Sequence, residues 1–162
     1  MAVKLARKAG GILKTGRKRE SIAPLIWDPP YLGSQKYLLP DLVIERENET
    51  IIIDAKYKSH WEDLNSRNWY SLTEEIKERH RNDLFQVLAY STISESRNIV
   101  SCLVYPCTKT TWESLKKRRR LYHRASLGVG RRKVNLVLTA VPMEAEIDET
   151  VKYLIEAIMQ CA

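Results

Sequence analysis

The sequence predicts an α/β domain with three layers, in which a central mixed β-sheet is flanked by helices. Three observations predict it: a β-hairpin of apolar, β-branched residues, a long helical segment after it, and two later apolar strands that a basic segment connects. This order of elements is typical of a sheet with helices on both faces. The expected elements are residues 42–45, 51–53, 72–94, 99–105, 134–141 and 144–160.

The hairpin comes first, and its two strands flank a polar break centred on Asn48, which suits a hairpin loop. A polar linker with several aromatic residues follows, and we expect those rings to pack on the core rather than to stack on bases. The main helix at 72–94 can be capped by Ser71 or Thr73, and acidic residues occupy its first turns, as the helix dipole favours. The next strand should end at Pro106, and the last segment is an amphipathic helix.

Length and composition predict a folded protein with a polyanionic partner. A chain of 162 residues is long enough for one domain with a sizeable core. Its 44% hydrophobic and 29% charged residues are typical of a globular chain rather than a disordered one. The net charge of +7 suits a nucleic acid or another polyanion. We divide the chain into a basic N-terminal arm at 1–19 and a folded domain at 20–162.

The sequence gives no sign of a membrane or secretory protein. No apolar run approaches the ~20 residues of a transmembrane helix, and we find no convincing signal peptide. The cysteines Cys102, Cys107 and Cys161 are odd in number and lack paired spacing. They indicate free thiols in a reducing compartment, rather than a disulfide framework or a zinc site. We therefore expect a cytoplasmic protein without membrane contact.

The N-terminal third is the least informative part of the sequence. Two adjacent glycines, Gly10 and Gly11, interrupt any helix within the basic arm. The arm could bind phosphates, but we expect a poorly ordered tail. Residues 22–27 could form either a strand or a helical turn, and the Asp-Pro-Pro sequence at 28–30 cannot continue a helix.

Charged residues at the end of the hairpin should converge. Side chains alternate along a strand, so Asp54 and Lys56 point to the same face, and folding the hairpin can bring Asp41 next to Asp54. Two nearby carboxylates repel each other unless a cation lies between them, and their oxygens suit Mg²⁺ or Mn²⁺. A lysine beside them can hold an activated water or stabilise charge on a phosphate. The alternative is an ordinary surface hairpin with charged ends.

The same residues carry a resemblance to a known family. Pro40-Asp41 followed by Asp54-Ala55-Lys56 resembles the PD-(D/E)xK nuclease superfamily, which has the restriction-endonuclease-like fold. The longer run at 52–58 and the downstream run at 83–90 are similar to the nuclease domain of McrC, the cleavage subunit of a modification-dependent restriction system. The Gln86-x-x-x-Tyr90 element is also shared with RecB-type nucleases. The resemblance covers about residues 36–106.

The resemblance implies a metal-dependent deoxyribonuclease of the restriction endonuclease type. It implies that Mg²⁺, or Mn²⁺, is held by Asp41, Asp54 and the backbone carbonyl of Ala55. Lys56 would then help to activate water or to stabilise the phosphate during hydrolysis. The catalytic set that it implies is Asp41, Asp54, Lys56, Gln86 and Tyr90.

Two further acids each have two interpretations. Asp83 shares a helix face with Gln86 and Tyr90, and it could either join the site or only anchor the helix. Enzymes of this superfamily often add a glutamate from a helix before the first strand. Glu20 is the only acid before Asp28, which makes it the candidate, and a solvated glutamate is the alternative.

The basic segment at 108–132 predicts a nucleic-acid-binding surface. A run of cations more often covers a solvated helix face, but its density beside a nuclease site favours phosphate contacts. The residues assigned to this surface are Lys116, Lys117, Arg118, Arg119, Arg120, Arg131 and Arg132.

DNA is the expected substrate, and the resemblance to McrC implies a nucleotide-hydrolysing motor as a partner subunit. A homodimer is a further candidate assembly. Two other functions stay open: a junction-resolving or repair exonuclease of the same superfamily, and a non-catalytic nucleic-acid-binding module on a decayed nuclease fold.

Overall fold

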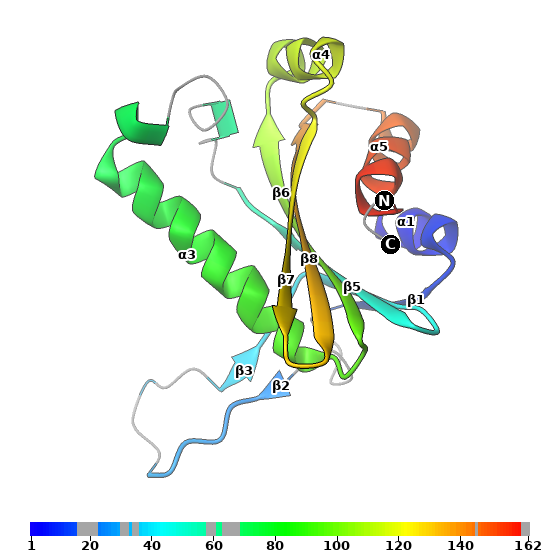
Figure 1. Ribbon diagram of the computed structural model, residues 1–162. Coiled ribbons are helices and arrows are strands. Elements are labelled where there is room, and N and C mark those ends of the chain that lie inside the picture. Colours follow the sequence, from blue (N-terminus) through cyan, green and yellow to red (C-terminus); the bar gives the residue numbers. More distant parts are fainter. Residues whose placement is uncertain are drawn as a thin grey trace.

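A mixed six-stranded β-sheet forms the centre of the computed structural model, with strand order β1-β4-β5-β6-β8-β7 (Figure 1). The structure describes residues 1–15, 23–29, 33, 36–57, 61–62, 69–144 and 146–159. The helices are α1 (Ala2–Ala9), α3 (Glu74–Tyr90), α4 (Lys109–Lys117) and α5 (Ile147–Met159), with short 3₁₀ turns at Trp69–Ser71 and Ser91–Ile93. The strands of the sheet are β1 (Ile12–Thr15), β4 (Leu42–Glu45), β5 (Glu49–Ala55), β6 (Asn98–Cys107), β7 (Tyr122–Val129) and β8 (Arg132–Pro142).

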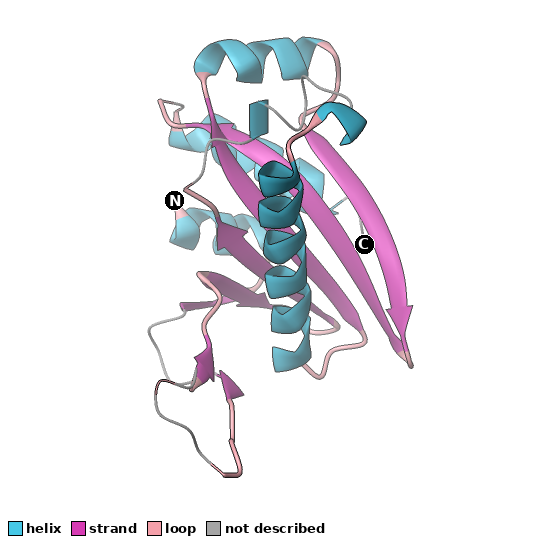
Figure 2. Ribbon diagram, turned by 90° about the vertical axis from the view of Figure 1, so that its left-hand side faces the viewer, coloured by secondary structure: helices cyan, strands magenta, loops and turns pink. Residues whose placement is uncertain are grey.

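Helices cover both faces of this sheet. Helices α1 and α5 lie side by side on one face, and α3 crosses the other face (Figures 1 and 2). Helix α4 lies at one end of the sheet, where Trp112 and Leu115 are buried. The predicted α/β fold with a central mixed sheet between helices is therefore confirmed.

The predicted hairpin is confirmed as β4 and β5, which pair antiparallel with Leu42 opposite Ile53. Beyond it, β5, β6 and β8 run parallel to one another, and β7 returns antiparallel at the edge of the sheet. Strand β5 is buried over almost its whole length, because it lies in the interior of the sheet with helices on both sides. The parallel β5–β6 pairing starts at Glu49–Asn98 and ends at Ala55–Val104.

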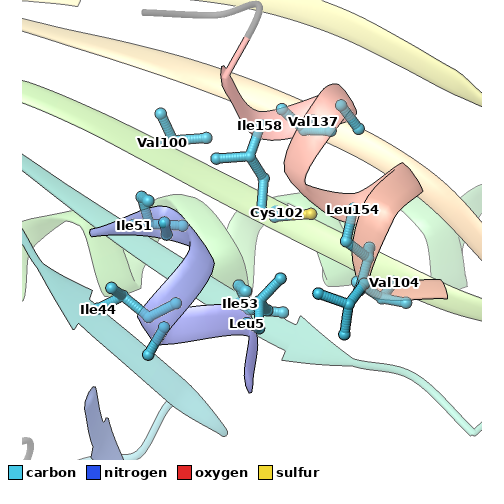
Figure 3. Packing of buried hydrophobic residues seen from close by; sticks show 14 residues of the cluster. Leu5, Ile44, Ile51, Ile53, Val100, Cys102, Val104, Val137, Leu154 and Ile158 are labelled. Atoms are coloured by element: carbon cyan, nitrogen blue, oxygen red, sulfur yellow. The ribbon is translucent and has the colours of Figure 1, made fainter. Parts of the chain in front are cut away.

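Side chains alternate along β5, so they contribute to apolar clusters on both faces of the sheet. Ile51 and Ile53 face α1 and α5, where they pack with Leu5, Leu154 and Ile158 (Figure 3). The intervening side chains face α3, where a second apolar cluster contains Val87, Leu103 and Tyr105 and a third contains Ile52 and Tyr90. Cys102 and Cys107 are buried, and Cys161 lies outside the described residues.

The first fifteen residues differ from the expected disordered tail. Helix α1 buries Leu5, Ala6 and Ala9 against the sheet, and β1 pairs antiparallel with β4. Gly10 ends the helix with a left-handed φ of 69°, which glycine adopts without strain. At Gly11 a Cβ would lie 2.5 Å from the Ile44 side chain, so the sheet approaches the backbone too closely for a larger residue. The boundary drawn after residue 19 lies among residues that the structure does not describe.

Strands β2 (Ala23–Pro24) and β3 (Tyr37–Leu38) pair antiparallel in a small ribbon beside the main sheet. Of the interval 22–27, for which a strand and a helical turn were both open, residues 23–24 form a strand and residue 22 lies outside the described residues. Helix α3 begins after Thr73, whose hydroxyl accepts a hydrogen bond from the Ile76 backbone N–H at 3.4 Å. In the described part of the chain, no helix combines the length and the apolar character that crossing a membrane requires.

Two elements within the basic segment were not predicted. Residues 109–117 form helix α4, and residues 122–129 form the edge strand β7. Strand β6 continues one residue past Pro106, to Cys107. Residues 123–128 of β7 are exposed, so this part of the strand lacks the apolar alternation by which a half-buried strand is recognised.

Candidate active site

The predicted catalytic residues meet in a cleft between the end of the hairpin and helix α3. The cleft has a volume of about 350 Å³. Its lining consists of Leu39, Asp41, Asp54, Ala55, Lys56, Tyr57, Asp83, Gln86 and Tyr90. The structure therefore brings together all five residues of the predicted catalytic set, from three separate segments of the chain.

Hairpin register places the first carboxylate. Because Leu42 pairs with Ile53, Asp41 just before β4 lies beside the end of β5. Its Oδ2 accepts a hydrogen bond from the Ala55 backbone N–H at 2.8 Å. This bond aims the Asp41 carboxylate across the mouth of the hairpin.

Asp54 is a carboxylate at the buried end of a strand, with only 5% of its surface exposed. Burial raises the pKa of the Asp54 carboxyl, and the nearby carboxylates of Asp41 and Asp83 raise it further. The ammonium of Lys56 opposes this rise, since its Nζ lies 2.6 Å from Asp54 Oδ2. No donor meets this buried oxygen at a hydrogen-bond angle within the described chain, so it keeps lone pairs for another cation.

Lys56 lies at the centre of the polar contacts in the cleft. Its Nζ donates to Gln86 Oε1 at 2.5 Å and pairs with Asp83 Oδ1 at 3.3 Å, in addition to the pair with Asp54. Burial alone would lower the pKa of Lys56, but the two carboxylates outweigh it and raise the pKa. The lysine is thus held as a charged ammonium at the centre of the cleft.

Helix α3 contributes Gln86 and Tyr90, which lie four residues apart and therefore on one face. Gln86 Nε2 donates to the Tyr90 hydroxyl at 2.7 Å, while its Oε1 accepts from Lys56. Burial raises the pKa of Tyr90, so the phenol stays protonated at neutral pH. The glutamine therefore joins the tyrosine to the lysine.

Asp83 belongs to the cleft as well as to the helix packing. Its Oδ1 pairs with Lys56, and its Oδ2 accepts a hydrogen bond from the Tyr105 hydroxyl at 3.2 Å. His80 Nδ1 lies 3.3 Å from the same hydroxyl. Sequence reasoning missed Tyr105 and His80. The available signal was a tyrosine in an otherwise apolar buried strand, because a buried hydroxyl needs a polar partner.

Every side chain described for the cleft lies in one continuous stretch of sequence. Residues 30–106 match the family model of the McrBC 5-methylcytosine restriction system component. The match covers 77 of the 162 residues, and it contains β4, β5, α3 and most of β6. No curated protein matches the chain. The segment that builds the cleft is thus similar to a component of a McrBC-type restriction system.

The basic residues lie outside the McrBC-matched segment and do not form one patch. Lys117, Arg118, Arg119 and Arg120 are exposed at the end of α4, whereas Arg131 and Arg132 lie at the turn between β7 and β8. The eight residues of β7 separate the two groups, a span of about 26 Å at ~3.3 Å per residue.

Three of the seven predicted DNA-binding cations make contacts within the protein. The contact of Arg118 is local, since its Nε donates to the backbone carbonyl of Ser114 on α4 at 3.3 Å. Lys116 Nζ pairs with Glu149 on α5 at 2.8 Å and lies 5.1 Å from the centre of the Tyr153 ring. Arg132 Nη1 donates to the backbone carbonyl of Ser94 at 3.1 Å. These contacts hold Lys116 and Arg132 against the domain, so the exposed end of α4 is the better candidate for phosphate contacts.

Two other expectations concern residues near the cleft. Trp61 is buried and stacks on Tyr105, with ring centroids 5.5 Å apart, so it packs on the core as expected. The expectation is wrong for Tyr70 of the same linker, which is 87% exposed. Glu20, the candidate additional acid, lies outside the described residues. Within the described chain, no three or more histidine, cysteine, aspartate and glutamate side chains are grouped closely enough to hold a metal ion by themselves.

Proposed function

We propose that this chain is a metal-dependent DNA endonuclease and the cleavage subunit of a McrBC-type restriction system. One observation carries the proposal: the segment that matches the McrBC family model is also the segment that assembles Asp41, Asp54 and Lys56 in one cleft. A match elsewhere in the chain, or a cleft built from other segments, would not link the family to this chemistry.

The donors in the cleft fit a hard divalent cation. Asp41 and Asp54 present carboxylate oxygens at neighbouring strand ends, and the described contact of the buried Asp54 Oδ2 is its ion pair with Lys56 at 2.6 Å. The described residues that line the cleft include neither cysteine nor histidine, the ligands that zinc prefers. Oxygen-only donors with room for water are typical of Mg²⁺ and Mn²⁺. Asp41, Asp54 and the Ala55 carbonyl would hold the ion, with water or phosphate completing its shell.

The chain's own residues would orient the substrate around that ion. The ion supplies Lewis acidity and lowers the pKa of bound water. Lys56 offers a fixed positive charge to the scissile phosphate as negative charge develops on it. Gln86, fixed by Tyr90, holds the Lys56 ammonium from the helix side. The hairpin would therefore bind the cation, and α3 would orient the lysine.

The test is cleavage of supercoiled plasmid with Mg²⁺, Mn²⁺ or EDTA, using unmodified DNA and DNA that contains 5-methylcytosine. We expect nicking with either cation and none in EDTA. If the McrBC likeness extends to assembly, nicking should also require a partner motor and its nucleotide. Asp54→Asn is the inactive control, and Asp148→Asn on α5 is the matched control outside the cleft. Absence of cleavage with both cations, with and without the motor, would contradict the proposal.

A further inference from the structure

Among the described residues, the ammonium of Lys56 has three acceptors, and they come from two different elements. Asp54 belongs to the same strand end as the lysine, whereas Asp83 and Gln86 come from α3. Asp54 is also a proposed ligand of the divalent cation. A carboxylate shared by a cation and an ammonium holds each less firmly, so Lys56 needs another anchor of negative charge.

Asp83 is built to be that anchor. It is buried, and each of its two oxygens has a different donor: Oδ1 faces Lys56 Nζ and Oδ2 faces the Tyr105 hydroxyl. A carboxylate held at both oxygens cannot rotate freely, so its position is set by β6 as well as by α3. Asp83 thereby transmits the position of a core strand to the lysine.

Tyr105 is fixed in turn by its surroundings. Its side chain is fully buried, and its ring stacks on Trp61 with an interplanar angle of 24°. Burial raises the pKa of Tyr105, so its hydroxyl keeps the proton that it donates to Asp83. Because this single proton is used, His80 Nδ1 must be the donor in its 3.3 Å contact with the hydroxyl oxygen.

We propose that Asp83 is a positioning residue for Lys56, held in place by the hydroxyl of Tyr105 and, behind it, by the ring of His80. This inference rests on the proposed function and adds a group of residues to that site. The Tyr105 hydroxyl and the Lys56 ammonium face the two oxygens of Asp83, and His80 contacts the hydroxyl from the side of the core. These contacts run from the buried core to the cleft, so the core decides where the ammonium lies.

A double-mutant cycle tests the role of the hydroxyl. Tyr105→Phe removes one hydrogen bond and keeps the ring, and it should lower kcat about fivefold while leaving the KM for DNA unchanged. Asp83→Asn should lower kcat at least tenfold. In the Asp83→Asn background, Tyr105→Phe should cause no further loss, because the hydroxyl acts through Asp83.

The matched control is Tyr153→Phe, which removes a hydroxyl from another packed tyrosine, on α5 and outside the cleft. It should leave kcat unchanged. Thermal unfolding of each variant shows whether it is folded. Additive losses in the double variant, or a normal kcat in Tyr105→Phe, would overturn the proposal.

A second measurement does not depend on cleavage. With ¹³C at lysine Cε, the NMR signal of Lys56 in metal-free protein, identified by its absence in Lys56→Arg, reports the surroundings of the ammonium. Tyr105→Phe should shift that signal, and Tyr153→Phe should not. If the parent protein proves inactive, the proposed function fails, but this spectrum still decides whether Tyr105 and Asp83 position Lys56. An unchanged Lys56 signal would overturn the positioning role.

Discussion

Asp41 and Ala55 are joined by a hydrogen bond of 2.8 Å between a side-chain carboxylate and a backbone N–H, across the open end of the β4–β5 hairpin. The bond closes the hairpin where its backbone pairing stops. It also fixes one proposed cation ligand relative to the strand that carries the other, Asp54.

Because of this hydrogen bond, two substitutions at Asp41 can distinguish the effect of its charge from the effect of its hydrogen bond. Asp41→Asn keeps an acceptor for the Ala55 N–H but loses the charge, so Mn²⁺ affinity should fall at least tenfold with little change in Tm. Asp41→Ala loses both, and its Tm should fall by a few degrees as well. Calorimetric titration with Mn²⁺ and thermal unfolding measure the two effects. Glu45→Gln, on the same hairpin but outside the cleft, is the control, and equal Mn²⁺ binding by Asp41→Asn and the parent would remove Asp41 from the site.

Asp54 should make the metal-free protein less stable as the pH rises. Its pKa is raised in the folded state, so the native protein binds this proton more tightly than the unfolded chain does. The protonated Asp54 carboxyl contributes its full share to the free energy of unfolding below the unfolded-state pKa of 3.8. This contribution is lost as the pH rises through the pKa of Asp54 in the folded state. Asp54→Asn mimics the protonated acid, and it should abolish cleavage.

Urea unfolding of the parent and of Asp54→Asn, each in EDTA from pH 4 to 7, measures this effect. The stability of Asp54→Asn relative to the parent should increase across that range. A difference that stays constant with pH would mean that the Asp54 pKa is not raised.

Lys56→Ala should separate cation binding from the chemical step. The ammonium is not a ligand and pairs with Asp54, so its loss should leave Mn²⁺ affinity equal or higher while the cleavage rate falls. Titration calorimetry and plasmid nicking on the same preparation compare the two properties. Loss of Mn²⁺ binding in Lys56→Ala would show that the lysine supports the structure of the site instead.

Gln86 should matter more to the rate than to the fold. It contacts Lys56 and Tyr90 but lies on an exposed part of α3, so Gln86→Ala should lower the rate at least tenfold, or about 1.4 kcal/mol of barrier. The Tm should change by only a few degrees. Tyr90→Phe isolates the tyrosine hydroxyl, and a normal rate in Gln86→Ala would confine the site to the hairpin.

The exposed end of α4 should contribute phosphate contacts. Replacing Lys117, Arg118 and Arg120 by glutamine should flatten the slope of log affinity against log salt on duplex DNA by about 0.9 per lost contact. Lys116→Gln is the matched control. Because Lys116 pairs with Glu149, its substitution should leave the salt slope unchanged. If the triple variant keeps the parent slope, this end of α4 lies away from the DNA.

The local pattern of the sequence was sufficient to predict the hairpin and the main helix. Residues 42–45 and 51–53 are β-branched runs around a polar turn, and such a pattern has one favourable pairing, which leaves Asp41 and Asp54 adjacent. The spacing of Gln86 and Tyr90 likewise placed them on one face of α3, since helical geometry sets that relationship without help from the rest of the chain.

Tertiary structure decided the rest. The basic N-terminus resembles a tail in sequence, yet α1 is ordered because Leu5 and Ala9 find an apolar face on the sheet that local pattern cannot reveal. Strand β7 forms by pairing with β8 rather than by burial. Asp83 could be read either as a helix anchor or as part of the site. Its contacts with Lys56 and Tyr105 join residues 22 or more positions apart, and only packing of α3 on the sheet brings such groups within reach.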